Sequence, residues 1–180
     1  MSTPVPDLTI AIPSDRPERF VETVMAKCQK DKGYAAKLKR SDNPATEYQS
    51  WEILASFGID LEKEYQRLPY ETIAAAIAKS KNEKNGSLTM GQALAGCYED
   101  GTGSDQAKAK LRRVLACQDT VEVCRIFRPL FSLINSRSKS PLNYVKILKQ
   151  LLNFYWNDQS VKAQWAQEFY RGNVSKQEES

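Results

Sequence analysis

The chain has 180 residues, of which 41% are hydrophobic, and it carries 26 Lys or Arg, 22 Asp or Glu and no His. A chain of this size can bury a core of its own, as one globular unit or as two small subdomains. No apolar run approaches the roughly 20 residues that span a bilayer, and the segment Met1 to Asp7 lacks the basic start and apolar core of a signal peptide, so we expect a cytoplasmic protein with no membrane partner.

The spacing of apolar residues predicts an all-α protein with about eight or nine helices in a compact bundle. Capping-box spacing at Asp15 and Asp119, and a capping side chain before proline at Asn43 and Ser140, indicate helix starts. The predicted helices cover residues 15–30, 43–57, 61–68, 69–80, 87–97, 105–117, 119–135 and 140–156, with a ninth near 158–171.

Glycine and proline give the expected helix ends. Gly58 and Gly172 are typical of residues just past a helix, and Pro69 should end one helix or open the next. Two polar stretches, 81–86 and 99–104, are rich in turn-forming residues and bracket the junction between two groups of helices.

These signals predict a domain organisation in four parts. We expect an extended or disordered segment over 1–14, an N-terminal helical bundle over 15–86, a C-terminal helical bundle with a basic face over 87–172, and a disordered tail over 173–180.

Histidine and cysteine usage argues against catalysis. The absence of histidine removes the commonest general base and every Ser-His-Asp or Cys-His arrangement. Cys28, Cys97, Cys117 and Cys124 form no Cys-x-x-Cys pair, so we interpret them as reduced, mostly buried thiols. We therefore expect no cofactor, no metal and no enzymatic activity. A helical enzyme using carboxylates such as Glu62, Glu64 and Glu71 is a minor alternative.

The surplus of positive over negative charge is confined to one region of the chain. Residues 105–155 contain ten Lys or Arg and three Asp or Glu, whereas the other residues contain 16 and 19. The net charge of +4 is therefore entirely regional, and a segregated basic surface favours a polyanionic partner.

Six basic residues of this region form three pairs at helical spacing, so that each pair shares a helix face: Lys108 with Arg112, Arg125 with Arg128, and Lys146 with Lys149. Three successive predicted helices each carry one pair, and three further basic residues precede the helix that starts at Asn43. The predicted nucleic-acid-binding residues are Lys37, Lys39, Arg40, Lys108, Arg112, Arg113, Arg125, Arg128, Lys146 and Lys149.

Plainer interpretations remain open at this point. Each basic pair taken alone could be an ordinary solvated helix face, and the residues near Lys37 could be a solvated loop. The basic face could also dock on an acidic protein, which would make the chain a helical interaction adaptor. Nearby aromatic residues could stack on unpaired bases, but their helical spacing favours core packing, with Tyr144 and Tyr155 the best candidates for exposure.

Four segments of the C-terminal half match a known family in their order and spacing: Met90 to Ala95, Leu111 to Leu115, Cys124 to Leu133 and Val161 to Tyr170. Together they resemble the small subunit of the type I-E CRISPR Cascade complex, the CasB family. The resemblance covers roughly residues 87–171, and the N-terminal half matches more loosely through 34–40 and 51–57.

This resemblance implies a non-enzymatic subunit of an RNA-guided antiviral ribonucleoprotein. Its partners would be the large subunit and backbone subunits of Cascade, guide RNA, target DNA, the displaced single strand and a second copy of itself. Sequence would be read by base pairing, and the subunit would contact nucleic-acid backbone. In the family the basic residues lie on the C-terminal helices, a pattern that Arg112, Arg113, Arg125, Arg128, Lys146 and Lys149 match by position or neighbourhood, and Arg40 resembles the basic position of the N-terminal block.

Overall fold

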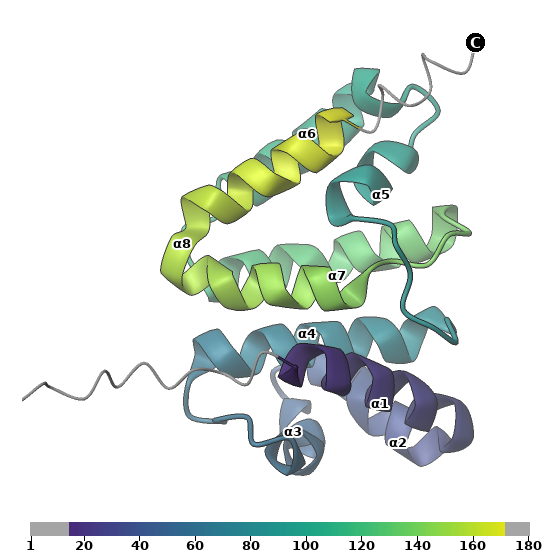
Figure 1. Cartoon of the computed structure of the whole chain (residues 1–180), viewed down its shortest axis with the longest axis vertical. Helices are drawn as coiled ribbons and strands as arrows, with labels where there is room; N and C mark the ends of the chain where they lie inside the picture. The colour runs from purple at the N-terminus through teal and green to yellow at the C-terminus, as the bar shows by residue number, and fades with distance from the viewer. Residues whose placement is uncertain (1–14, 172–180) are drawn as a thin grey trace, which may run out of the picture.

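The computed structural model describes residues 15–171, and these residues form an all-α protein, as the sequence predicts. In Figure 1 the N-terminal helices α1 to α4 form the lower part of the molecule and the helices α5 to α8 form the upper part. Within the described residues the only β interaction is an isolated parallel bridge between Leu88 and Leu142. None of the helices in 15–171 is long and apolar enough to cross a membrane.

The lower part is organised around one central helix. Its α-helices are α1 (Arg16–Lys30), α2 (Lys32–Lys39), α3 (Trp51–Ser56) and α4 (Glu64–Ser80), with 3-10 turns η1 (Arg40–Asp42) and η2 (Glu47–Ser50). Every residue of α4 from Leu68 to Ala78 is buried. A helix that is buried all round must be covered on every side, and α4 packs on α1 and α2 below and on α7 and α8 above.

The upper part consists of α5 (Met90–Gly96), the 3-10 turn η3 (Gly101–Gly103), α6 (Asp105–Leu115), α7 (Thr120–Arg137) and α8 (Tyr144–Arg171). Helix α8 is kinked at Asn157, whose φ of −152° and ψ of 62° are not helical. The Asn157 side chain accepts a hydrogen bond from Ser160 N and so caps the second half of the helix. The predicted boundary between helices 140–156 and 158–171 is therefore confirmed.

The two halves of α8 form a V, and α5 packs on α8 between the two arms (Figure 1). Gln150, only 5% exposed, joins them: its Nε2 donates to Glu168 Oε1 at 2.9 Å, and its Oε1 accepts from Trp165 Nε1 at 2.8 Å. Gly91 N of α5 donates to the other Glu168 oxygen. A Cβ on Gly91 would lie 2.4 Å from Phe169 N, so only glycine allows α5 this close to α8.

Several predicted helix starts are correct and others are wrong. Asp119 caps α7 by accepting a hydrogen bond from Glu122 N, as predicted. Asp15 precedes α1 but makes no side-chain capping bond. Ser140 does not cap α8: the helix begins four residues later, where Asn143 Oδ1 accepts from Lys146 N.

The segment 43–57 differs more strongly from the prediction. It holds a turn, in which Asn43 Oδ1 accepts from Ala45 N, then η2 and the short α3. Gly58 follows α3 with a φ of +74°, which confirms the predicted helix end. Pro69 lies inside α4 and does not break it, because tertiary packing around this buried helix outweighs the lost hydrogen bond.

The buried residues of both parts form one continuous core. The extensive packing of α4 on α7 and α8 crosses between the two predicted bundles, and the division of the chain at residue 86 stays a prediction. The expectations for 1–14, for 173–180 and for Gly172 lie outside the described residues.

Candidate nucleic-acid interface

A groove of about 460 Å³ lies between α6 and α7. Its cations are Lys110 and Arg113 from α6 and Arg125 from α7, and its one acid is Glu122. Apolar side chains complete the lining: Ile126, Pro129 and Leu130. The groove therefore offers three positive charges beside an apolar surface.

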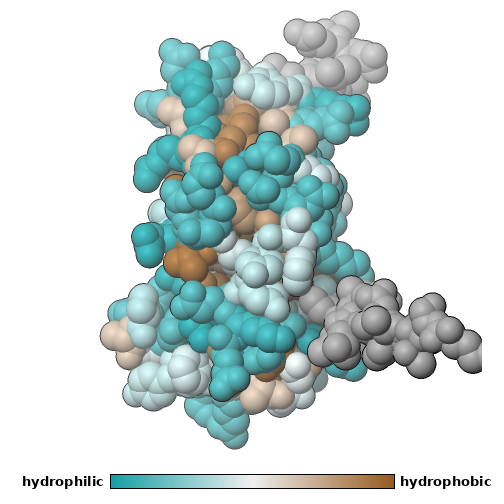
Figure 2. All heavy atoms as spheres, turned by 90° about the vertical axis from the view of Figure 1, so that its left-hand side faces the viewer, coloured by the Kyte–Doolittle hydropathy of each residue, from teal (hydrophilic) through white to brown (hydrophobic). Residues whose placement is uncertain are grey.

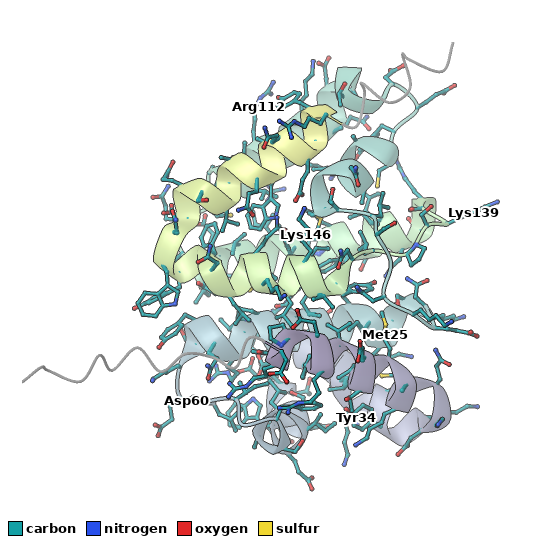
Figure 3. The ribbon with its side chains drawn as sticks, in the orientation of Figure 1. Met25, Tyr34, Asp60, Arg112, Lys139 and Lys146 are labelled. Carbon is teal, nitrogen blue, oxygen red and sulfur yellow. The ribbon has the colours of Figure 1, made fainter. Side chains whose placement is uncertain are left out.

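Helix α6 presents its cations on two different sides. Ser104 Oγ caps the helix by accepting from Ala107 N, and Ala107, Leu111 and Val114 form its buried face. At 100° per residue, Lys110 and Arg113 flank this buried face on the side of the groove. The predicted pair Lys108 and Arg112 flanks it on the opposite side. Figure 3 places Arg112 at the upper end of the molecule.

Helix α7 sets the opposite wall of the groove. Its buried face includes Val123, Phe127 and Leu130, and Arg125 projects on the exposed side. Glu122 is held at the start of the helix, where its Oε2 accepts a hydrogen bond from Gln118 N. Glu122 forms no ion pair with the groove cations among the described residues.

Arg128, predicted to share a binding face with Arg125, points elsewhere. Its Nε lies 3.6 Å from Asp42 Oδ1, and the two side chains are 17% and 20% exposed. Lys79 of α4 pairs with the second oxygen of the same carboxylate. Arg128 therefore joins α7 to the lower part of the molecule, and the structure does not bring it together with Arg125 in the groove.

Lys146 and Lys149 of α8 also have acidic partners from distant segments. Lys146 Nζ lies 3.3 Å from Glu168 Oε1, and Lys149 pairs with Glu18 of α1. The hydrogen bond from Lys149 lowers the pKa of the Glu18 carboxyl. Residues 140–156 contain no Asp or Glu, so both partners come from outside this segment, Glu168 from the second half of α8 and Glu18 from α1. Both lysines keep close to half of their side-chain surface exposed.

The N-terminal candidates lie apart from the groove. Lys37 and Lys39 are exposed on α2, which packs on α1, α4, η1 and η2, and Figure 1 shows α2 at the opposite end of the molecule from α6. Arg40 Nη1 donates to Gln49 Oε1 at 2.8 Å. These three cations do not continue the α6–α7 surface, so any contact that they make with nucleic acid would be a separate one.

The aromatic residues confirm one half of the exposure prediction. Tyr155 is 53% exposed, whereas Tyr144 is fully buried because its ring packs against Phe131 in the core. Phe127, Phe131 and Phe154 are core residues, as predicted, whereas the core position expected for Trp156 is wrong, because its side chain is 70% exposed. No aromatic side chain lines the α6–α7 groove in the part of the chain that the structure describes.

Lys110 is the groove residue that the sequence reasoning missed. It belongs to the ten-cation region, but the residues of α6 predicted to bind nucleic acid were Lys108, Arg112 and Arg113. The spacing of three between Lys110 and Arg113 was an available signal. Of the remaining cations, Arg137 Nη1 donates to Cys97 O at 3.0 Å and its guanidinium lies over the Tyr98 ring.

The structure does not gather the carboxylates of the enzyme alternative. Glu71 is completely buried, where its Oε1 accepts from Trp51 Nε1 at 2.8 Å, whereas Glu62 and Glu64 are exposed. All four cysteines are free thiols. No group of three or more Cys, Asp or Glu side chains within 15–171 is arranged to hold a metal ion.

The family model and the similar solved structures all belong to CRISPR-associated proteins. The family model of CRISPR-associated protein Cse2 matches residues 34–170. Three solved structures have similar folds. CasB of M. ruber has a TM-score of 0.70 and 21% identity, with 91% of this chain and 96% of that chain covered. A CRISPR RNA-guided surveillance complex has a TM-score of 0.71 and 17% identity, with 91% and 97% of the two chains covered, and CasB from Thermus thermophilus has a TM-score of 0.66 and 18% identity, with 86% and 97% covered. No curated protein matches the chain.

Proposed function

The chain belongs to the family of CRISPR-associated protein Cse2. We propose that it is a non-catalytic subunit of an RNA-guided surveillance complex in antiviral defence. In this complex it binds the nucleic-acid backbone without reading the base sequence. The observation that carries this proposal is the α6–α7 groove, where Lys110, Arg113 and Arg125 converge from two helices. None of these three cations is ion-paired to an acid within residues 15–171.

The chemistry of the groove suits phosphate better than base edges. Lys and Arg bind phosphate oxygens regardless of sequence, whereas base readout requires bidentate groups fixed in a groove of the nucleic acid. Exposed side chains such as Arg113 and Arg125 can follow a backbone of any sequence. A subunit that must accept every target needs this indifference, because recognition is left to base pairing with the guide.

The similarity to a surveillance complex supports the assembly part of the proposal. In this assembly the chain would lie beside the large subunit and the backbone subunits, next to a second copy of itself, and contact guide RNA, target DNA and the displaced strand. Lys108 and Arg112, on the other side of α6, and Lys37, Lys39 and Arg40, at the far end of the molecule, would make separate backbone contacts. Arg128, Lys146 and Lys149 would contribute less because their charges are already paired.

The test is the salt dependence of binding to a labelled, mixed-sequence single-stranded DNA of about 30 nucleotides. If six cations contact phosphates, the slope of log K against log salt is about −4, since each contact contributes roughly −0.7. The variant Arg113→Gln/Arg125→Gln should weaken binding and flatten the slope by about one unit or more.

The matched control is Lys63→Gln/Lys84→Gln, which removes two exposed cations outside the groove and should leave the slope unchanged. Equal slopes for the groove variant and the wild type would remove the groove from the binding site. Absence of binding even at low salt would point to the alternative in which the basic face docks on an acidic protein.

A further inference from the structure

Three aromatic side chains meet where α4 begins and α8 bends. The Tyr65 and Tyr155 rings are stacked, with centroids 4.1 Å apart, and the Trp156 ring lies edge-on to both at 5.8 and 4.8 Å. We call Tyr65, Tyr155 and Trp156 the aromatic cluster. No part of the α6–α7 groove belongs to it.

The cluster is unusually open to solvent. Trp156 is 70% exposed and Tyr155 is 53% exposed, although large aromatic side chains are normally well buried. The non-helical backbone at Asn157 ends the first half of α8 directly after these residues. Figure 2 shows the face that carries this bend, on which hydrophilic side chains predominate and hydrophobic ones gather in small separate areas. The cluster is therefore a local aromatic surface and not the edge of an exposed core.

The exposed charges next to the cluster in the chain are mainly negative. Asp60, Glu62 and Glu64 precede or adjoin Tyr65, and Asp158 follows Trp156 by two residues. Glu64 is 63% exposed, and its contact with Arg67 is long, at 4.0 Å. Glu62 is exposed and has no ion-pair partner among the described residues.

The neighbouring cations are mostly withdrawn from solvent. Arg67 is 13% exposed and lies against Glu47, Glu71 and the Trp51 ring. Lys162 is 11% exposed and lies over the Phe154 ring. Of the described cations that lie near the cluster in the sequence, Lys63 is the exposed one, and it pairs with Asp60 at 3.5 Å. The exposed charge that flanks the cluster in the sequence is therefore mainly negative, opposite in sign to that of the groove.

We propose that the aromatic cluster is a docking site for a protein segment that carries an exposed arginine. A guanidinium binds the face of Trp or Tyr through cation–π attraction, and nearby carboxylates strengthen its binding. Trp, Tyr and Arg are also the residues that dominate the energetics of protein interfaces. Phosphates, in contrast, are repelled by Glu62 and Glu64, so this surface is not a continuation of the nucleic-acid site.

The chain itself contains two examples of the proposed contact. The Arg67 guanidinium lies 5.3 Å from the centre of the Trp51 ring, and the Arg137 guanidinium lies 5.0 Å from that of Tyr98. No cation of the described residues lies over Tyr65, Tyr155 or Trp156. Their exposed faces are free to accept a guanidinium from outside.

The test uses the full chain labelled with ¹⁵N, because its three tryptophans, Trp51, Trp156 and Trp165, give three indole N–H signals. The variant Trp156→Phe identifies the signal of Trp156. The probe is a short Gly/Ser peptide with two arginines, and its control has citrulline in place of arginine, which keeps the shape and removes the charge. A third arm uses the single-stranded DNA of the salt experiment.

The arginine peptide should shift the Trp156 signal at least fivefold more than the citrulline peptide, and the Trp51 and Trp165 signals should stay in place. Glu62→Gln/Glu64→Gln should weaken peptide binding about threefold. Equal responses to the two peptides, or no response at millimolar peptide, would overturn the proposal. A larger shift with DNA would assign the cluster to base stacking instead. Arg113→Gln/Arg125→Gln should leave the peptide response unchanged, which separates this proposal from that for the groove.

Discussion

Arg128 Nε lies 3.6 Å from Asp42 Oδ1, so a cation expected from its sequence to hold nucleic acid instead joins α7 to the turn that follows α2. Arg125, only three residues earlier, lines the α6–α7 groove. Two arginines on adjacent turns of one helix therefore have different roles, and substitutions can separate them.

Arg128→Gln should destabilise the protein, and Arg125→Gln should not. The Arg128 side chain is mostly buried, and its loss leaves Asp42 with Lys79 alone, so we expect a cost of about 1 kcal/mol in the free energy of unfolding. Arg125 is exposed, and its replacement should change stability by less than about 0.5 kcal/mol. Urea unfolding of both variants measures this difference. Equal destabilisation would contradict the assignment of separate roles.

The stability of the protein should fall as the pH rises from about 4.5 to 8 because of Glu71. The pKa of Glu71 is raised from 4.5 to about 8, mainly by burial of the carboxyl and also by the nearby Glu47. The hydrogen bond from Trp51 and the charge of Arg67 lower the pKa and offset part of this rise. Between these two values the folded protein holds a proton that the unfolded chain releases. Rising pH therefore favours unfolding, by at most ~1.4 kcal/mol per pH unit.

Glu71→Gln should remove this pH dependence, since the amide keeps an acceptor for Trp51 Nε1 and cannot ionise. The measurement is the urea midpoint of wild type and variant between pH 5 and 9. The exposed Glu64→Gln is the control and should retain the wild-type slope. If the wild type and Glu71→Gln respond identically to pH, Glu71 is not the titrating group.

Gly91→Ala should destabilise the packing of α5 against α8. The added Cβ would lie 2.4 Å from Phe169 N and 2.6 Å from Trp165 O, both backbone atoms that cannot rotate away. We expect a cost of about 2–3 kcal/mol in thermal or urea unfolding. Gly96→Ala on the same helix is the control, because its Cβ would meet no atom within 4 Å. If Gly91→Ala left the free energy of unfolding unchanged, α5 and α8 could move apart at little cost, contrary to this expectation.

The cysteines should be inert at neutral pH. Burial raises the pKa of Cys28 to about 11 and that of Cys124 to about 12, so their reactive thiolate forms are scarce. At pH 8 the half-buried Cys28 should react with a thiol reagent roughly 100-fold more slowly than free cysteine, and Cys124 only on unfolding. Fast labelling of any cysteine in the native protein would contradict this expectation.

Local sequence signals predicted the helical class and several boundaries, because caps and glycine turns act over a few residues. Asp119, Gly58 and the break at Asn157 are examples. The helix break predicted at Pro69 is wrong, because burial on all sides of α4 outweighs the tendency of proline to end a helix. The helix α2 was missed because its eight residues have only Ala35 and Leu38 as buried positions, too few for a clear period.

The candidate site was harder to predict, since charge pairing depends on tertiary contacts. The density of cations in 105–155 led to α6 and α7, and both Arg113 and Arg125 were among the predicted residues. The partners of Lys146 and Lys149 lie 22 and 131 residues away, at Glu168 and Glu18, beyond the reach of any local pattern.

The most direct test of the central claim is the response of individual arginine Nε–H signals when single-stranded DNA is added to the ¹⁵N-labelled protein at low salt. If the α6–α7 groove binds the strand, the signals of Arg113 and Arg125 shift first. The signals of Arg128 and Arg67, which are held by carboxylates, stay in place. Shifts confined to Arg40 or Arg128, with Arg113 and Arg125 unchanged, would contradict it.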